Sequence, residues 1–291
     1  MSRVEQSQIA QRDSTQRATD GCVLRGTTWS PTGSTRAHIV LMHGYGEHLG
    51  RYHEFAEFLA RLGYCVSGFD ARGHGRSDGQ RGHVSYFDRY VEDLHDFTRA
   101  ERAARPNLPL FVLGHSNGGL IAVRMIQSRA AVADGLILSS PLVALQPSHQ
   151  PIPVWIARYV AKLAARMPLP NGIKTRELTH DQALIEATDR DRLSHHWTTP
   201  GWYVAAHGAM SQVFAQLDYV QLPVLVLEGA RDPLVVPDQI TRMFNGFGNR
   251  DKELVIVPNA YHEVLNESGR RETYQRIDAW LSTRSSAHVA A

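Results

Sequence analysis

Short apolar runs alternate along the chain with segments in which apolar residues recur every three to four positions. Such runs are typical of strands buried on both faces, and the three-to-four spacing is typical of amphipathic helices. The runs predict strands at residues 22–29, 37–42, 64–69, 110–113, 135–139, 223–229 and 253–257. The spaced segments predict helices at residues 52–62, 87–97, 120–129, 237–247 and 274–281. Strands alternating with helices indicate the α/β class, with a mostly parallel central sheet flanked by helices.

The alternation stops after Pro141 and resumes only at Pro223. Between these prolines no run is typical of a buried strand, and the apolar positions predict helices instead. They are expected at residues 154–167, from a capping box at residues 179–182, and from Thr199-Pro200. We therefore predict a core made of residues 1–142 and 222–291, with a helical insertion at residues 143–221.

Composition and charge remove several classes of function. The formal net charge of +2 gives no basic field for a nucleic acid, so no nucleic-acid partner is expected. No stretch reaches the roughly 20 apolar residues of a membrane span. Residues 1–19 are polar, predict a mobile arm or an edge strand, and lack a signal-peptide core, so a cytoplasmic location is expected. Cys22 and Cys65 lie far apart and form no metal-type cluster, and neither a metal nor a cofactor is expected.

A serine lies where a predicted strand meets a predicted helix, in the sequence Gly114-His115-Ser116-Asn117-Gly118. Glycines two positions before and after Ser116 remove Cβ atoms that would clash in a sharp turn. The turn would expose the serine hydroxyl near the N-terminus of the helix, where negative charge is favoured. The pattern predicts a nucleophile elbow; the alternative is a structural turn built from small residues.

A nucleophilic serine needs a base, and the base needs an acceptor that fixes its tautomer. Asp232 and His262 supply these groups in the chain order expected after an elbow serine, Ser116. Both directly follow predicted strands, and ligand sites in parallel sheets lie beyond the C-terminal strand ends. Asp218 precedes its strand and Asp238 opens a helix, which favours Asp232. We predict Ser116, Asp232 and His262 as catalytic residues. The alternatives are that Asp232 is a turn residue and that His262 is a histidine in a surface loop.

The chain has 15 histidines, so the choice of His262 depends on its position. His115 adjoins the serine, but the turn is expected to aim its side chain away. His43 and His74 lie in glycine-rich loops, which they are expected to organise by hydrogen bonding. His262 follows the last predicted strand, where a catalytic base is expected.

The oxyanion of a tetrahedral intermediate requires preformed donors. One is expected from the backbone N–H of Asn117, directly after the serine. The second is expected from the loop after the strand at residues 37–42, as the N–H of Tyr45. Backbone donors do not depend on the identity of the side chain.

Four segments together resemble the monoacylglycerol lipase/lysophospholipase family of α/β-hydrolases. They are residues 43–52, 70–79, 114–119 and 261–263, and the first is the most specific because most α/β-hydrolases lack its Gly-Glu-His sequence. The resemblance extends over nearly the whole chain after about residue 20. It implies an α/β-hydrolase fold, serine ester hydrolysis without a cofactor or metal, and a cap over the active site. The inserted helices fit the role of the cap.

The resemblance also implies individual roles. The residue at Tyr45 lends an oxyanion N–H, and Glu47 and Arg51 belong to a polar network near the glycerol end of the site. Asn117 is a departure, because the family usually has methionine there. The N–H donor is unaffected, but a more polar pocket floor is expected, and this bears on any preference for long acyl chains.

These observations favour a serine ester hydrolase that forms an acyl-enzyme with monoacylglycerols, lysophospholipids or similar small acyl esters. The expected partner is therefore a small acyl ester or a single-chain lipid. Alternatives are a short-chain carboxylesterase or thioesterase, a serine peptidase of the same fold, and a non-catalytic receptor. Ser116 argues against a dehalogenase, which would need an aspartate at that position.

The helix predicted at residues 154–167 carries basic residues at intervals of four, so they share one face. They are Arg158, Lys162 and Arg166, and aromatic and aliphatic residues cover much of the remaining surface. This pattern is typical of a helix in a lipid–water interface, which would give the cap a peripheral contact with a membrane or micelle. The alternative is a cap helix packed on the domain with solvated basic groups.

Overall fold

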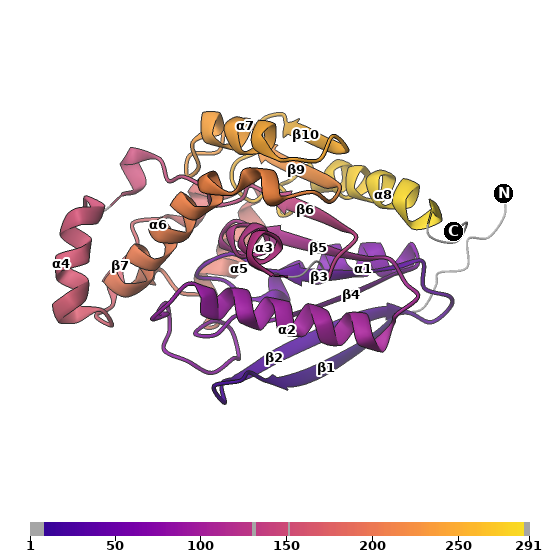
Figure 1. Ribbon diagram of the computed structural model, residues 1–291, viewed down its shortest axis with the longest axis horizontal. Helices are drawn as coiled ribbons and strands as arrows, with labels where there is room; N and C mark the ends of the chain where they lie inside the picture. The colour runs from indigo at the N-terminus through magenta and orange to yellow at the C-terminus, as the bar shows by residue number, and fades with distance from the viewer. Residues whose placement is uncertain (1–8, 130–131, 151, 288–291) are drawn as a thin grey trace.

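The computed structural model describes residues 9–129, 132–150 and 152–287. Its centre is an eight-stranded sheet in the order β1-β2-β4-β3-β5-β6-β9-β10 (Figure 1). The strands are β1 (Ile9–Arg17), β2 (Val23–Pro31), β3 (Ala37–Met42), β4 (Tyr64–Phe69), β5 (Leu110–His115), β6 (Gly135–Ser139), β9 (Val224–Gly229) and β10 (Lys252–Val257). From β4 to β10 neighbouring strands are parallel, whereas β1 and β2 are antiparallel to their neighbours. The predicted α/β class and mostly parallel sheet are confirmed.

The inner strands are buried along their whole length, which explains why their sequences are continuous apolar runs. Side chains of β3 alternate between two cores: Val40 and Met42 face one, and Ile39 and Leu41 face the other. At the edge, β1 is largely exposed and polar. Of the two alternatives for the N-terminal arm, residues 9–17 form the edge strand, and residues 1–8 lie outside the described residues.

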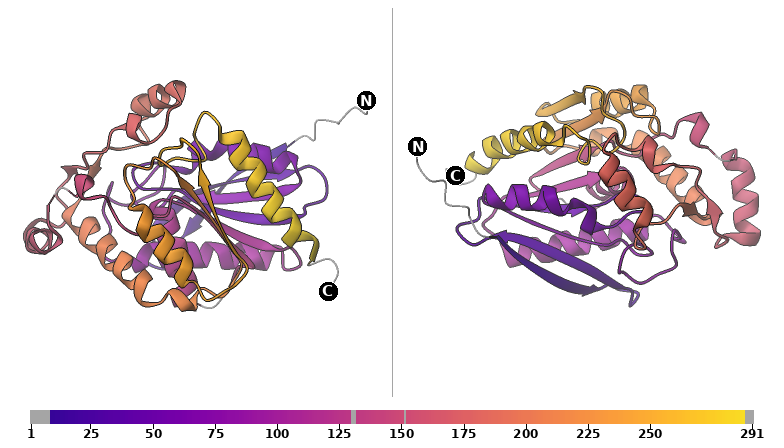
Figure 2. Two further views of the ribbon diagram at one scale, coloured as in Figure 1. Left: turned by 90° about the horizontal axis from the view of Figure 1, so that it is seen from above. Right: turned by 180° about the vertical axis from the view of Figure 1, so that it is seen from behind.

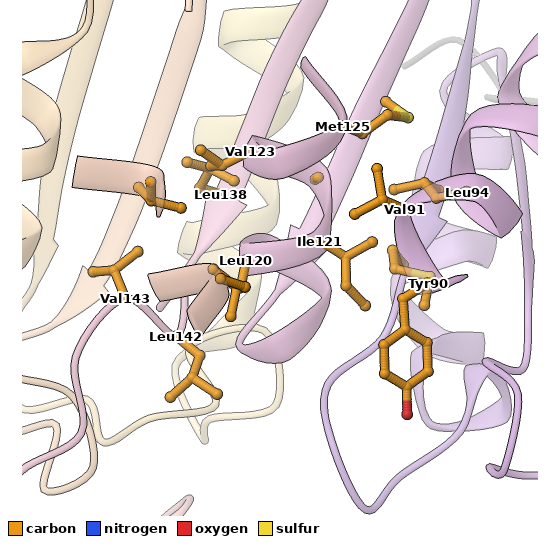
Figure 3. Close-up of a cluster of buried hydrophobic side chains, with 14 of the residues drawn as sticks. Tyr90, Val91, Leu94, Leu120, Ile121, Val123, Met125, Leu138, Leu142 and Val143 are labelled. Carbon is orange, nitrogen blue, oxygen red and sulfur yellow. The ribbon is translucent and has the colours of Figure 1, made fainter. Parts of the chain in front are cut away.

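Helices cover both faces of the sheet (Figure 2). They are α1 (His53–Arg61), α2 (Asp88–Ala104), α3 (Asn117–Ser128), α7 (Pro237–Gly246) and α8 (Arg270–Ala287). Helices α2, α3 and α7 share one core, and α1 and α8 share the other. In the first core, Ile121 of α3 faces Tyr90 and Val91 of α2, and Leu120 lies beside Leu142 (Figure 3). This packing fixes α3, and with it the turn that precedes it.

The segment between β6 and β9 projects beyond one end of the sheet, with α4 at the far edge of the molecule (Figure 1). It contains α4 (Val154–Ala164), α5 (Gln182–Arg190), α6 (Pro200–Ala215) and the paired two-residue strands β7 (Leu169–Pro170) and β8 (Trp197–Thr198). Short 3-10 helices lie at Pro147–His149, Thr175–Glu177 and Leu217–Tyr219, and another precedes α1 at Leu49–Tyr52. Helix α6 packs against both α3 and α4, so it joins the inserted segment to the core. None of the helices in the described part of the chain is long and apolar enough to span a membrane.

One predicted helix start is wrong and one is confirmed. The N-cap of α5 is Asp181, whose side chain accepts from the Leu184 N–H at 3.1 Å, and not Thr179. The Thr179 hydroxyl instead donates to the Asn266 carbonyl at 2.9 Å and accepts the Asp181 N–H at 3.1 Å, so it holds the residue that caps the helix. Thr199 caps α6 as predicted, with Pro200 as the first helical residue.

Candidate active site

The turn between β5 and α3 holds Ser116 in a strained backbone conformation. Its φ of 51° and ψ of −118° lie outside the backbone regions that residues other than glycine readily adopt. A Cβ at Gly114 would come within 2.4 Å of the Gly118 carbonyl oxygen, and one at Gly118 within 2.2 Å of the Met42 carbonyl oxygen. Both glycines are therefore required for the turn to close against β3.

The structure brings together the serine, the aspartate and the histidine that the sequence singled out. The distance from Ser116 Oγ to His262 Nε2 is 2.8 Å, and that from His262 Nδ1 to Asp232 Oδ2 is 2.7 Å. The other Asp232 oxygen accepts the N–H groups of Leu234 at 2.7 Å and Val235 at 3.1 Å. The three side chains therefore form one buried hydrogen-bonded series.

Burial and charge act in opposite directions on the pKa of His262. Burial alone would lower it, but the negative charge and hydrogen bond of Asp232, with Glu263 and Glu47 nearby, raise the pKa above the usual 6.5. For Asp232, burial would raise the pKa, but His262 and the backbone N–H donors hold it below its usual value. The aspartate is therefore ionised when the histidine titrates, and it favours the protonated imidazole.

Two backbone N–H groups lie in positions where they could bind an oxyanion. Asn117 is the first residue of α3, so its N–H has no helical acceptor. The loop after β3 lies against the serine, since a Cβ at Gly44 would be 3.3 Å from Ser116 Cβ. Neither the Asn117 nor the Tyr45 N–H donates to another described residue. Both donors are thus available to a ligand at the serine.

The side chain of Tyr45 anchors the loop after β3 to the inserted segment. Its hydroxyl donates to the Gly82 carbonyl at 2.8 Å, and its ring centroid is 3.7 Å from that of Trp202 in α6. The side chain of Tyr45 therefore holds this loop against both Gly82 of the core and α6 of the inserted segment.

Glu47 and Arg51 belong to a buried ionic cluster that connects the two loops of the site. The Glu47 carboxylate accepts from the Gly44 N–H at 2.5 Å and from the Arg51 guanidinium at 2.6 Å. The same guanidinium makes two hydrogen bonds to Glu263, at 2.8 and 2.7 Å, and Glu263 directly follows His262. The cluster therefore fixes the donor loop relative to the histidine loop. The role of Glu263 was not predicted, although its place beside His262 was a signal.

The inserted segment also holds the loop that carries the histidine. The Glu263 N–H donates to the Leu178 carbonyl at 2.8 Å. Glu267 accepts from the His180 N–H at 3.0 Å and lies 3.0 Å from its Nδ1. Together with the contact between Thr179 and Asn266, these bonds tie residues 178–180 to the loop that carries His262.

Residues 33–269 match the family model described as serine aminopeptidase, S33. The match covers more than half of the chain. The chain belongs to this family. A monoacylglycerol lipase of Mycolicibacterium smegmatis is 31% identical over 254 residues, which cover 87% of this chain and 90% of the relative. A phospholipase of Bacillus subtilis is 28% identical over 246 residues, covering 84% of this chain and 94% of the relative.

A solved structure with the same fold is the monoacylglycerol lipase of Paleococcus ferrophilus. Its TM-score is 0.81 at 28% identity, and the similarity covers 89% of this chain and 98% of that one. The resemblance to the monoacylglycerol lipase/lysophospholipase family and the α/β-hydrolase fold are thus both confirmed.

The three histidines of this S33-family chain that were weighed against His262 have hydrogen-bond partners elsewhere. His43 Nε2 accepts the Ala71 N–H at 2.9 Å, and its Nδ1 lies 2.7 Å from the Gly44 carbonyl oxygen. His74 Nδ1 lies 3.1 Å from the Arg72 carbonyl. His115 Nδ1 lies 3.1 Å from the Ser139 carbonyl oxygen, and its ring lines the cavity with its centroid 5.0 Å from that of His262. No group of three or more side chains that could hold a metal ion occurs within the described ranges.

A cavity between the core and the inserted segment opens onto Ser116 and His262. Its apolar lining comes from both parts and includes Leu142, Leu145, Leu178, Trp202 and Leu234, while Glu47, Arg51 and Glu263 add a polar region. Asn117 is not among the lining residues, and its side chain is buried. The expectation that Asn117 makes the pocket floor more polar is therefore wrong, because its Oδ1 atom is buried away from the cavity.

Proposed function

We propose that this chain hydrolyses the ester bond of single-chain lipids, such as monoacylglycerols or lysophospholipids, with Ser116 as the nucleophile. The observation that carries the proposal is the hydrogen-bonded series Ser116–His262–Asp232 at the opening of a largely apolar cavity. Relatives named monoacylglycerol lipase and phospholipase support a lipid ester over the peptide that the family description names.

In the proposed first step, His262 Nε2 accepts the proton of Ser116 Oγ while the oxygen attacks the ester carbonyl. The tetrahedral oxyanion receives hydrogen bonds from the N–H groups of Tyr45 and Asn117. When the intermediate collapses, the imidazolium returns its proton to the leaving alcohol, and the acyl group stays on the serine. A water molecule then repeats the sequence and releases the fatty acid. Asp232 stays ionised throughout and holds the imidazole in position.

The cavity also suggests how the substrate is oriented. We place the acyl chain against the apolar lining, and the alcohol near the ionic cluster of Glu47, Arg51 and Glu263. The hydrogen bonds of Glu47 and Arg51 are taken up largely within that cluster, so their proposed contribution is a polar surface of fixed geometry. Such a surface favours a small polyhydroxyl or phosphate-containing alcohol over a second acyl chain.

The experiment that tests the function is a panel of substrates. It contains p-nitrophenyl esters from acetyl to palmitoyl, a monoacylglycerol, a lysophosphatidylcholine, an acyl thioester and an aminoacyl p-nitroanilide. We expect the highest kcat/KM on the single-chain lipid esters. A preference for acetyl esters or thioesters would favour a general esterase, cleavage of the anilide alone would favour a peptidase, and no turnover would favour a receptor.

The pH dependence of kcat/KM should show one rising step as His262 loses its proton. Only the neutral imidazole can accept the serine proton, so activity increases as the pH rises through the pKa of His262. Because the pKa of His262 is raised, the midpoint should lie above the usual value of 6.5. Initial rates on a soluble short ester across a pH series measure the midpoint. A profile that stays flat from about pH 5 to 8 would contradict a histidine base.

We also propose that residues 143–221 form a cap whose outer helix, α4, contacts a lipid surface. Trp155 and Tyr159 are each 64% exposed, Leu163 is 92% exposed and Met167 is 44% exposed, at intervals of four residues. Arg158 and Lys162 lie exposed beside this row. The helix predicted to residue 167 ends at Ala164, so Arg166 lies beyond α4, where its Nε donates to Gln80 Oε1 at 2.6 Å. The opposite side of α4 faces the protein through the buried Ala157. A cap helix that merely covers the core would have its large apolar side chains underneath, so their outward position supports the interfacial alternative.

Charge reversal on α4 should separate membrane binding from hydrolysis. The triple variant Arg158→Glu, Lys162→Glu, Arg166→Glu should lower affinity for anionic vesicles by on the order of 100-fold, because each basic group near such a surface contributes about 1 kcal/mol. Activity on vesicle-borne lipid should fall with it, while activity on a soluble short ester should not change. Vesicle sedimentation at low and high salt measures the affinity, which should weaken with salt in the wild type.

A matched control reverses three exposed basic residues elsewhere, with Arg12→Glu, Arg192→Glu and Arg250→Glu. This variant has the same net charge as the α4 variant and should bind vesicles more tightly than it does. Equal vesicle binding by the wild type and the α4 variant would leave α4 as an ordinary cap helix.

A further inference from the structure

Glu228 carries a buried carboxyl group in the central sheet, and it was not predicted from the sequence as a candidate functional residue. It lies in β9, where the other residues are apolar or glycine, and it is 1% exposed. Neither carboxyl oxygen receives a hydrogen bond from an N–H or hydroxyl group of the described residues. An isolated carboxylate in such a place is strongly disfavoured, so this side chain requires either a donor or a proton of its own.

The neighbour of Glu228 is the carboxyl group of Asp232. The Asp232 N–H donates to the Gly229 carbonyl at 3.1 Å, and this turn folds the aspartate back towards the end of β9. After burial, the negative charge of the Asp232 side chain and a hydrogen bond with it are what raise the pKa of Glu228. Two neighbouring ionised carboxylates would repel each other, so a hydrogen bond between them requires a proton on one of them.

The hydrogen-bond partners determine which carboxyl group holds the proton. Asp232 faces three donors: two backbone N–H groups and the Nδ1 of His262. Glu228 has no comparable donor. Burial, and then the negative charge of Asp232, raise the pKa of Glu228 to about 10. The same donors hold the pKa of Asp232 below its usual value.

No other charged group of the described residues competes for this pair. His262 faces Asp232 from the loop after β10, and Glu47 and Glu263 act on His262. Arg231 lies between the two carboxyl groups in sequence, but its side chain is exposed. Ser140, directly after β6, donates its N–H to the Leu227 carbonyl next to Glu228, and its buried hydroxyl group does not titrate in this range. The charge that acts on Glu228 is therefore that of Asp232.

We propose that Glu228 is a neutral carboxylic acid that donates a hydrogen bond to the Asp232 carboxylate and so acts as a positioning residue. The inference depends on the proposed hydrolysis for its catalytic consequence. The bond fixes the aspartate in the orientation that faces His262. It also withdraws part of the negative charge that would stabilise the imidazolium, so more of His262 is neutral and able to act as a base near pH 7.

Two variants distinguish the effect of the hydrogen-bond donor at position 228 from the effect of a negative charge there. Glu228→Gln retains a donor of similar shape without the ability to ionise, and Glu228→Met retains the length without a donor. The readout is the pH dependence of kcat/KM on a soluble short ester, with kcat and KM measured separately. The rate of Ser116 modification by a fluorophosphonate gives the same dependence without any ester substrate.

The glutamine variant should follow the wild-type pH profile. The methionine variant should have its rising step at higher pH, by roughly 1 unit, because the unshared charge of Asp232 then favours the imidazolium more strongly. Its kcat should fall on the order of tenfold with little change in KM, since the lost interaction acts on the base and not on bound substrate. A step moved to lower pH in Glu228→Gln would mean that Glu228 is ionised in the wild type, and would overturn the proposal. Wild-type behaviour of Glu228→Met would overturn it as well.

Infrared spectroscopy tests the protonation without catalysis. The wild-type protein at neutral pH should show the carbonyl stretch of a buried carboxylic acid, and Glu228→Gln should lack it. Absence of this band from the difference spectrum would refute the neutral acid even if the methionine variant does not fold. If no ester is hydrolysed but the band is present, the proposed function fails while the protonated Glu228 stands.

Discussion

Replacing Ser116 with alanine should lower ester turnover by on the order of 10⁶-fold, the cost found when the nucleophile of the serine hydrolase subtilisin is removed. Ser116 Oγ is 2.8 Å from His262 Nε2. The backbone N–H groups of Asn117, next to the serine, and of Tyr45, in the adjacent loop, donate to no other described residue. Without the hydroxyl group no acyl-enzyme forms, and only the binding and oxyanion contributions to catalysis remain. Steady-state rates on the best ester of the panel, with fluorophosphonate labelling as a second readout, measure the loss.

The Ser116→Ala variant should fold like the wild type, because the turn is fixed by Gly114 and Gly118 and by the packing of α3. Thermal unfolding of both proteins by circular dichroism provides this control. If a correctly folded alanine variant retained a tenth of the wild-type rate, Ser116 would not be the nucleophile.

Replacing Asp232 with asparagine should lower kcat by on the order of 10⁴-fold, with a smaller effect on KM. Asp232 Oδ2 lies 2.7 Å from His262 Nδ1, so the carboxylate selects the tautomer whose Nε2 faces the serine. An amide can present its NH₂ group to Nδ1 and stabilise the opposite tautomer. The protonated imidazole would also lose its ionic partner, which lowers the pKa of His262 and moves the rising step to lower pH.

Asp218→Asn and Asp238→Asn provide the matched controls, because these residues were the alternatives for the same role. Asp218 lies in the 3-10 helix before β9, and Asp238 is exposed in the first turn of α7. Both variants should retain kcat and the pH profile. A comparable loss in either one, with Asp232→Asn unaffected, would assign the acceptor differently.

Much of the fold could be predicted because the inner strands are buried on both faces. The strands at residues 37–42, 64–69 and 135–139 were predicted with the bounds that the structure has. An apolar run bounded by polar residues and glycine leaves little freedom in placing such a strand. The elbow, and the order of the aspartate and histidine after it, were equally readable because each lies directly beyond one of these strands.

The features that were missed depend on contacts between distant segments. Thr179 has the sequence pattern of an N-cap, but its hydroxyl is used by Asn266, which lies 87 positions away. Asn117 follows the serine directly, but its buried Oδ1 does not line the cavity. The carboxyl group of Glu228 did interrupt an apolar run, and this was a signal, but its contact with Asp232 comes from the turn between them.

Because residues 178–180 bond to the histidine loop, only part of the inserted segment can be exchanged without disturbing His262. An exchange of the whole segment with a relative would replace the support of the base together with the cavity lining, so a loss of rate could not be assigned to substrate fit. An exchange limited to residues 150–173 would transfer the outer helix and the strand after it while leaving that support native. Residue 174 is therefore the boundary at which the proposed contact of α4 with a lipid surface can be altered without changing the bonds that hold the histidine loop.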